Sequence, residues 1–174
     1  ILTVGIIGAI GYPKGWEIIK RLSEKFKDKP VRFVIAGITA EINSKFSRRN
    51  LVITGRFERS DLPKIMEEYN VDVVLVPSIC PETYSYTTTE AIMMGLPVVV
   101  FNIGAQAERV KKLSAGFVVD SFSDLVNLIE DLLRDQSALE RVKKEMMVEV
   151  MSFGKWRKMY VHMLDCQNLQ QATF

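Results

Sequence analysis

The sequence predicts an α/β fold, in which a doubly wound, mostly parallel β-sheet is followed by a helical C-terminal tail. Two observations support this prediction. Short runs of valine and isoleucine alternate along the chain with segments in which apolar residues recur at helical spacing. These runs are apolar throughout, which is typical of parallel strands that helices cover on both faces.

Each element follows from its own pattern. Ile18, Ile19, Leu22 and Phe26 share one face of a helix, and Asp61 is a candidate capping residue for a later one. Strands are expected at residues 2–8, 31–38, 51–54, 71–76, 97–101 and 116–119. Helices are expected at residues 14–26, 85–94, 107–113, 124–134, 137–150 and 154–164, besides the one after Asp61.

Length and composition indicate one domain. A chain of 174 residues, 48% hydrophobic and 25% charged, is long enough for one well-buried core and short for two. We expect the α/β core in residues 1–120 and the helical tail in residues 121–174. Because the sequence begins at Ile1 and enters a predicted strand almost at once, we expect an excised piece of a longer protein.

The charge pattern argues against nucleic acid as a partner. The formal net charge is +2, from 23 basic and 21 acidic residues, and the basic residues are scattered. Two small basic clusters, residues 45–49 and Lys111 with Lys112, are interpreted as solvated surface rather than as a site for phosphate or an acidic membrane.

Neither a membrane span nor a secretory signal is predicted. No apolar run approaches the roughly 20 residues that a membrane-spanning helix needs. The two cysteines, Cys80 and Cys166, have neither metal-site nor disulfide-framework spacing, which favours a reducing compartment. We therefore expect a cytoplasmic location, with contact to the inner membrane face made, if at all, through the full-length protein.

One stretch carries most of the chemistry. Residues 81–91 read Pro-Glu-Thr-Tyr-Ser-Tyr-Thr-Thr-Thr-Glu-Ala and lie between a predicted strand and a predicted helix. Ligands of open α/β sheets bind at the carboxyl ends of the strands, and a helix N-terminus there offers unpaired N–H groups to an anion such as a pyrophosphate. Glu82 falls in the loop, and Glu90 falls about one turn into the helix.

Structural explanations of these residues stay open. Thr87-x-x-Glu90 fits a capping box, in which the glutamate only satisfies a backbone N–H group. Thr87 and Thr88 could act as plain N-capping residues, and Glu82 could be an exposed loop acid. The lone His162 in the tail is interpreted as solvated or packed, and Cys80 lacks the neighbouring histidine that a thiol nucleophile needs.

The spacing Glu82-x7-Glu90, followed by Ala91-x-x-x-Gly95-x-Pro-Val, resembles the signature of retaining GT-B glycosyltransferases, most closely family 4. Three further stretches match that family in the same order. Residues 4–11 with Lys14 resemble its opening strand and glycine-rich phosphate loop, residues 55–57 its mid-domain turn, and residues 103–108 its Gly-Gly-x-x-Glu loop. The resemblance implies the Rossmann-like, C-terminal half of a GT-B fold, which binds a nucleotide-sugar.

The resemblance also implies roles for individual residues. Glu82 would support the positive charge that develops on the donor sugar, and Lys14 would neutralise the departing diphosphate, so these two are the expected catalytic residues. Glu90 would accept hydrogen bonds from the ribose hydroxyls. The expected donor-binding residues are Gly8, Gly11, Lys14, Glu82, Tyr86, Thr87, Thr88, Glu90 and Gly104. No metal is expected, because Asp-x-Asp is absent and cationic and dipolar groups can replace Mg²⁺.

Three positions depart from the family pattern. Ala9 stands where the family has an arginine, so either lysine acts alone or phosphate binding is weaker than usual. Ser85 and Ala105 stand where the family usually has glycines. Close approach of the backbone to the ligand is therefore in question at those two positions.

The leading hypothesis is a hexosyltransferase-type retaining glycosyltransferase that acts in polysaccharide or glycoconjugate synthesis. Its acceptor, a glycan or lipid-linked glycan, would bind an N-terminal domain outside this sequence, so the piece alone should bind donor and transfer little. Residues 152–156 resemble the start of the family's crossing helix.

Two alternatives stay open. A GT-B-type sugar-nucleotide 2-epimerase fragment would need a histidine in the active loops, and His162 is far from them. A non-enzymatic receiver-like module would need a phosphorylatable aspartate and an acidic pair after the early strands, and residues 8–11 offer none.

Overall fold

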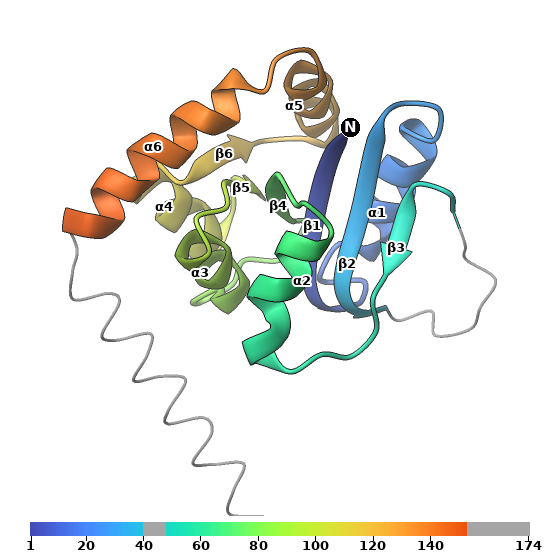
Figure 1. The fold of residues 1–174 in the computed structure, drawn as a ribbon, viewed down its shortest axis with the longest axis horizontal. Helices are drawn as coiled ribbons and strands as arrows, with labels where there is room; N and C mark the ends of the chain where they lie inside the picture. Colours follow the sequence, from blue (N-terminus) through green and yellow to red (C-terminus); the bar gives the residue numbers. More distant parts are fainter. Residues whose placement is uncertain (40–47, 153–174) are drawn as a thin grey trace, which may run out of the picture.

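The computed structural model describes residues 1–39 and 48–152 and confirms the predicted α/β fold (Figure 1). The predicted helix at residues 154–164, the segment resembling a crossing helix from Phe153 onward, and the two residues His162 and Cys166 lie outside the described part of the chain.

Strands and helices alternate along the described chain. The strands are β1 (Leu2–Ile10), β2 (Val31–Thr39), β3 (Leu51–Ile53), β4 (Val73–Val76), β5 (Val98–Phe101) and β6 (Gly116–Val119). The helices are α1 (Trp16–Lys25), α2 (Leu62–Glu68), α3 (Tyr86–Met93), α4 (Gly104–Lys112), α5 (Phe122–Arg134) and α6 (Ser137–Ser152), and a 3-10 turn, η1 (Arg59–Asp61), precedes α2.

The described strands form one parallel sheet in the order β3-β2-β1-β4-β5-β6. The chain builds the sheet from β1 to one edge and then returns to the other side of β1 with β4. The strand order therefore reverses between β1 and β4, which is the point where open α/β sheets bind ligands. A receiver-like module has the order 2-1-3-4-5, so that alternative does not fit this sheet.

Helices cover both faces of the sheet, and each face has its own apolar core. On one face, α1 and α5 contribute buried residues such as Leu22 and Leu132. On the other, α2, α3 and α4 contribute residues such as Met66 and Val110. Helix α6 reaches both cores, because Leu139 joins the first and Met146 the second.

The turn after β1 differs from the prediction. Strand β1 continues to Ile10 because it pairs with β2 as far as Ile10 opposite Thr39. The carbonyl of Gly11 then accepts hydrogen bonds from the N–H groups of Lys14 and Trp16, both at 3.1 Å. Helix α1 therefore begins at Trp16, and Lys14 lies in the preceding turn rather than in the first helical turn.

Helix α2 follows Asp61 as predicted, although Asp61 does not cap it, and helices α4 and α5 begin earlier than predicted. Asp61 occupies the N-cap position of α2, but its side chain makes no capping hydrogen bond, because η1 leads directly into the helix. Helix α4 starts at Gly104, three residues before the prediction.

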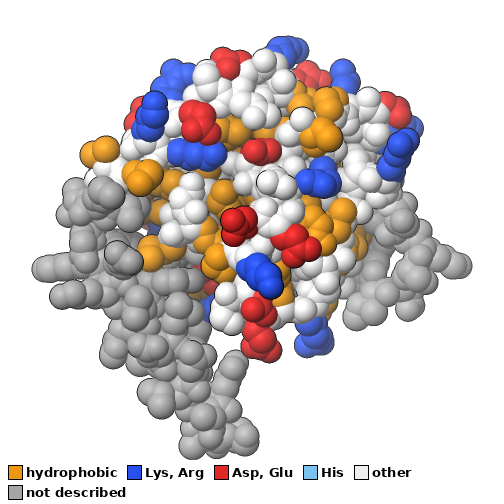
Figure 2. Space-filling model, in the orientation of Figure 1, with side chains coloured by type: hydrophobic (Ala, Val, Ile, Leu, Met, Phe, Trp, Pro, Cys, Tyr) orange, Lys and Arg blue, Asp and Glu red, His pale blue; other side chains and the backbone are white. Residues whose placement is uncertain are grey.

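The surface view shows acidic and basic side chains interspersed on one face, with apolar patches between them (Figure 2). None of the helices in the described part of the chain has the length and apolar character that crossing a bilayer requires.

Candidate functional site

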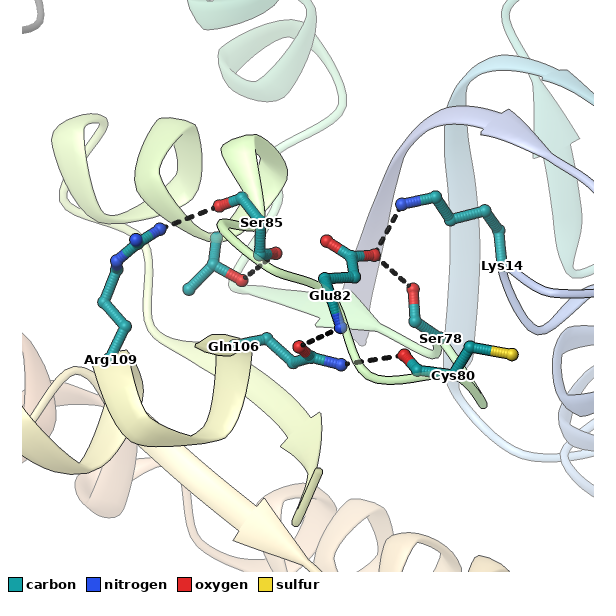
Figure 3. Close-up of polar contacts among 8 residues, drawn as sticks. Lys14, Ser78, Cys80, Glu82, Ser85, Gln106 and Arg109 are labelled. Carbon is teal, nitrogen blue, oxygen red and sulfur yellow. Dashed lines mark hydrogen bonds and ion pairs between the residues drawn. The ribbon is translucent and has the colours of Figure 1, made fainter. Parts of the chain in front are cut away.

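Lys14 and Glu82 meet at the carboxyl edge of the sheet (Figure 3). Lys14 follows β1 and Glu82 follows β4, so the two strands at the reversal of strand order each deliver one charge. Lys14 Nζ lies 2.5 Å from Glu82 Oε1. The lysine side chain is 48% exposed and the glutamate side chain 16% exposed, so this ion pair faces an accessible edge rather than the core.

The surroundings of Glu82 favour its ionised form. Partial burial would raise the pKa of this carboxyl, but hydrogen bonds from Lys14, Ser78 and Ser85 and the charge of Lys14 together lower it below its ordinary value. The Ser78 hydroxyl donates to Glu82 Oε1 at 2.7 Å, directly after β4. Glu82 is therefore favoured as an ionised carboxylate next to the Lys14 cation.

Glu90 sits in a different environment. It lies on α3, is 5% exposed, and forms an ion pair with Arg59 of η1, where Arg59 Nε is 2.8 Å from Glu90 Oε1. The contact is close but not aligned as a hydrogen bond, so Glu90 Oε1 is buried without a hydrogen-bond donor among the described residues. Burial raises the pKa of the Glu90 carboxyl, and the charge of Arg59 only partly opposes this effect.

The capping-box explanation of Glu90 is wrong. The N-cap residue of α3 is Ser85, so Thr87 lies inside the helix and cannot form the box with Glu90. Ser85 has φ +60°, a left-handed conformation that favours glycine and costs other residues roughly 1–2 kcal/mol. Glycine would adopt this backbone geometry without that cost.

The threonines and the tyrosine at the start of α3 have distinct surroundings. Thr88 is fully buried, and its hydroxyl is hydrogen-bonded to that of Ser85 at 2.8 Å. Thr87 is half-buried and Tyr86 is 45% exposed, so these two lie nearer the surface. The Tyr86 ring packs against the Tyr84 ring, with centroids 4.8 Å apart.

The glycines expected to bind phosphate lie at or next to the end of β1. Gly8 is inside the strand, opposite Gly37, with φ +113° and open space where a Cβ would stand. Gly11 begins the turn that carries Lys14, and its carbonyl is used by that turn.

Gly104 packs against the loop that carries Glu82. It has φ +59°, and a Cβ there would come within 2.8 Å of Gln106 Oε1, the Glu82 nitrogen and the Pro81 Cα. The position requires glycine because the start of α4 and the Glu82 loop approach each other so closely.

Sequence reasoning missed two polar residues of α4. Gln106 is fully buried, and its side-chain amide bonds the backbone of Cys80 and Glu82 (Figure 3). Arg109 donates to the Ser85 carbonyl at 2.9 Å and to the Thr89 hydroxyl at 2.7 Å. No local pattern marked these two residues, because their hydrogen-bond partners lie 20–26 positions away in the sequence.

Comparisons with known proteins identify the family and support the fold. The family model described as glycosyl transferases group 1 matches residues 2–147. The C-terminal domain of LpcC from Francisella tularensis, a glycosyl transferase group 1 family protein, has a TM-score of 0.71 at 16% identity, over 87% of this chain and 85% of that one. A search of curated protein sequences gives no significant match.

Two longer proteins contain a similar domain. HepE from Anabaena, solved in complex with UDP-glucose, has a TM-score of 0.70 at 19% identity, over 95% of this chain and 49% of that one. TarM has a TM-score of 0.71 at 18% identity, over 94% of this chain and 34% of that one. The chain thus spans half or less of the length of these two proteins. The family model covers most of the chain and the fold agrees, so the chain belongs to the glycosyl transferases group 1 family, with the fold of a GT-B C-terminal domain.

Proposed function

We propose that this chain is the donor-binding domain of a retaining glycosyltransferase, which transfers a sugar from a nucleoside-diphosphate sugar to an acceptor in polysaccharide or glycoconjugate synthesis. The observation that carries the proposal is the meeting of Lys14 and Glu82 where the strand order reverses. The complex of HepE with UDP-glucose, a protein of similar fold, supports a donor of this class.

The leaving group is the first task of such a site. In the proposed reaction, the bond between the anomeric carbon and the diphosphate oxygen breaks, and the electron pair stays on the diphosphate. The Lys14 ammonium, 48% exposed, and the N-terminus of α3 are positioned to stabilise that negative charge. These groups can do so without a metal ion, and we propose that none is required.

The sugar is the second task. The acceptor hydroxyl oxygen forms the new bond to the anomeric carbon on the same face of the sugar and loses its proton to the departing diphosphate, through a state in which positive charge develops at the anomeric carbon. Glu82 would stabilise that charge, since its pKa is held below the ordinary value and it stays ionised. When a donor diphosphate draws Lys14 away, the Glu82 carboxylate becomes available to the sugar.

The ribose is the third task. Glu90 is buried, and its Oε1 lacks an aligned hydrogen-bond donor in the described part of the chain. A carboxylate can accept two hydroxyl donors at once, so two ribose hydroxyls would complete its hydrogen bonding. Tyr86 and Thr87, at the surface end of α3, would contact the donor, whereas buried Thr88 would act by holding Ser85.

The acceptor would bind a further domain of the whole protein, so the 174-residue chain is expected to bind donor and to transfer little. The 2-epimerase alternative would act on the same donor class but needs a histidine in the active loops. The only histidine of the chain is His162. No observation in the described residues favours that activity.

A nucleotide panel tests the proposal. The chain is expected to be stabilised by one of UDP, GDP and ADP, because a ligand that binds only the folded state raises Tm. Calorimetry should then give the Glu90→Gln variant at least about fivefold weaker affinity for that nucleotide, since one charge-assisted hydrogen bond is lost. Absence of stabilisation by all three would overturn the proposal, and equal affinities would overturn the ribose assignment.

A further inference from the structure

Helix α4 contacts the loop that carries Glu82 at two points. We define the Glu82 loop as residues 80–85 and the α4 clamp as Ala105, Gln106 and Arg109. None of the three clamp residues is needed for the chemistry proposed above. Their contacts nevertheless all fall on the loop or on the first turn of α3 that follows it (Figure 3).

The first point of contact encloses the backbone of Glu82. The Glu82 N–H donates to Gln106 Oε1 at 3.2 Å, and the Glu82 carbonyl accepts from the N–H of Ala105 at 3.0 Å. The other end of the Gln106 amide donates to the Cys80 carbonyl at 3.3 Å. Both backbone polar groups of Glu82 are therefore bonded to α4.

The second point of contact is the far end of the loop. Arg109, one turn further along α4, donates to the Ser85 carbonyl and to the Thr89 hydroxyl. Its guanidinium also lies over the Tyr84 ring, 4.1 Å from the centroid. Arg109 thus holds the residue with φ +60° through which the loop enters α3.

The clamp is specific rather than incidental. Gln106 has no exposed surface, and a buried amide is tolerated only when its polar atoms are hydrogen-bonded, which here requires the loop in this position. Gly104 permits the approach, because a Cβ at that position would overlap the Gln106–Glu82 hydrogen bond. Helix α4 is itself fixed by Ala107 and Val110 in the core of one sheet face.

We propose that Gln106 and Arg109 are positioning residues, which fix the backbone of the Glu82 loop so that the Glu82 carboxylate is aimed at Lys14 and, when donor is bound, at the sugar. The inference rests on the proposed function for its use of Glu82. The clamp itself can be tested without any ligand, because Glu82 reports its own position through its contacts with Lys14 and Ser78.

The test combines two readouts on Gln106→Leu and Arg109→Met in the 174-residue chain. In ligand-free protein, NMR titration of the glutamate carboxyls should show the pKa of Glu82 rising toward its ordinary value when the loop is released. Calorimetry should show the affinity for UDP-glucose falling about fivefold more than the affinity for UDP, the equivalent of one hydrogen bond. GDP-mannose with GDP, or ADP-glucose with ADP, replaces this pair if the panel selects another base.

Met66→Ala is the matched control. It makes a cavity in the same apolar core but on α2, away from the clamp helix, and should lower Tm while leaving the Glu82 pKa and the sugar preference unchanged. An unchanged Glu82 pKa in both clamp variants, or an equal rise in the control, would overturn the inference. If the wild type binds no nucleoside diphosphate, the proposed function fails, and the ligand-free titration alone decides whether the clamp exists.

Discussion

The surroundings of the two glutamates eight positions apart shift their pKa values in opposite directions. Glu82 receives hydrogen bonds from Lys14 and Ser78, which lower its pKa despite partial burial. Glu90 is more deeply buried, and burial raises its pKa, because the charge of Arg59 beside it opposes that effect only in part. In the proposed function, Glu82 must stay ionised because it faces a developing positive charge. Glu90 binds hydroxyls, so the free-energy cost of burying its carboxylate can persist until the ligand binds.

That cost predicts a pH dependence for Glu90. A carboxyl whose pKa is raised on folding destabilises the ionised folded state, so the penalty grows as pH rises from the ordinary pKa through the folded one. Glu90→Gln should therefore be more stable than wild type near pH 8 and unfold at a higher temperature. The gain in free energy of unfolding is about 1.4 kcal/mol for each unit by which folding raises the Glu90 pKa, and little difference is expected near pH 4.5. Thermal melts of both proteins at the two pH values provide the measurement.

The comparison would go against this account if Glu90→Gln were equally or less stable near pH 8.

The sequence alone could not have given this result. It offered the capping box and the ribose contact as rival explanations of Glu90. The helix register excludes the capping box, and the backbone of Ser85 determines that register through a positive φ that no sequence pattern specifies.

At the scale of elements, the turn between β1 and α1 decides where Lys14 lies. Gly15 has φ +82°, and a Cβ there would lie 2.0 Å from the Pro77 carbonyl oxygen just after β4. The N–H of Ile79 also donates to the Pro13 carbonyl at 3.1 Å. The turn after β1 and the loop after β4 are therefore packed backbone against backbone, which brings Lys14 to Glu82.

Gly15→Ala should disrupt this packing. The alanine would have to adopt the left-handed conformation and its Cβ would overlap with Pro77, so we expect the free energy of unfolding to fall by more than about 2 kcal/mol. The control is Gly95→Ala, where φ is +73° but nothing lies within 4 Å of the added Cβ. The free energy of unfolding of Gly95→Ala should fall by only about 1 kcal/mol. Urea unfolding of the two variants measures the difference, and equal losses would refute the close packing of the turn.

The order and type of the described elements were predictable because valine-rich runs and helical spacing report burial directly. The start of α1 was not predictable, since it depends on two hydrogen bonds to the Gly11 carbonyl and on contact with Pro77. Gln106 was also missed, because a glutamine that bonds a distant loop looks like any other helix-forming residue until the fold brings α4 beside residues 80–85.

At the scale of the whole molecule, the reversal of strand order explains why these groups converge. Strands β1 and β4 are neighbours, and the chain continues from them to opposite halves of the sheet, so the turn after β1 and the loop after β4 meet at the carboxyl edge where the strand order reverses. Lys14 comes from one loop, Glu82 from the other, and α3 begins next to them. The fold thus brings the Lys14 cation to one edge together with a carboxylate and a helix N-terminus that are both far from it in the sequence.

The proposed function requires that Lys14 binds the donor diphosphate at this edge. Calorimetry of wild type and Lys14→Met with the nucleoside diphosphate that the panel selects, and with the corresponding nucleoside, measures this contact. We expect the variant to bind the diphosphate about tenfold more weakly or worse, because a charge-assisted contact is lost, and to bind the nucleoside with unchanged affinity. Equal affinity of the two proteins for the diphosphate would show that Lys14 does not bind it.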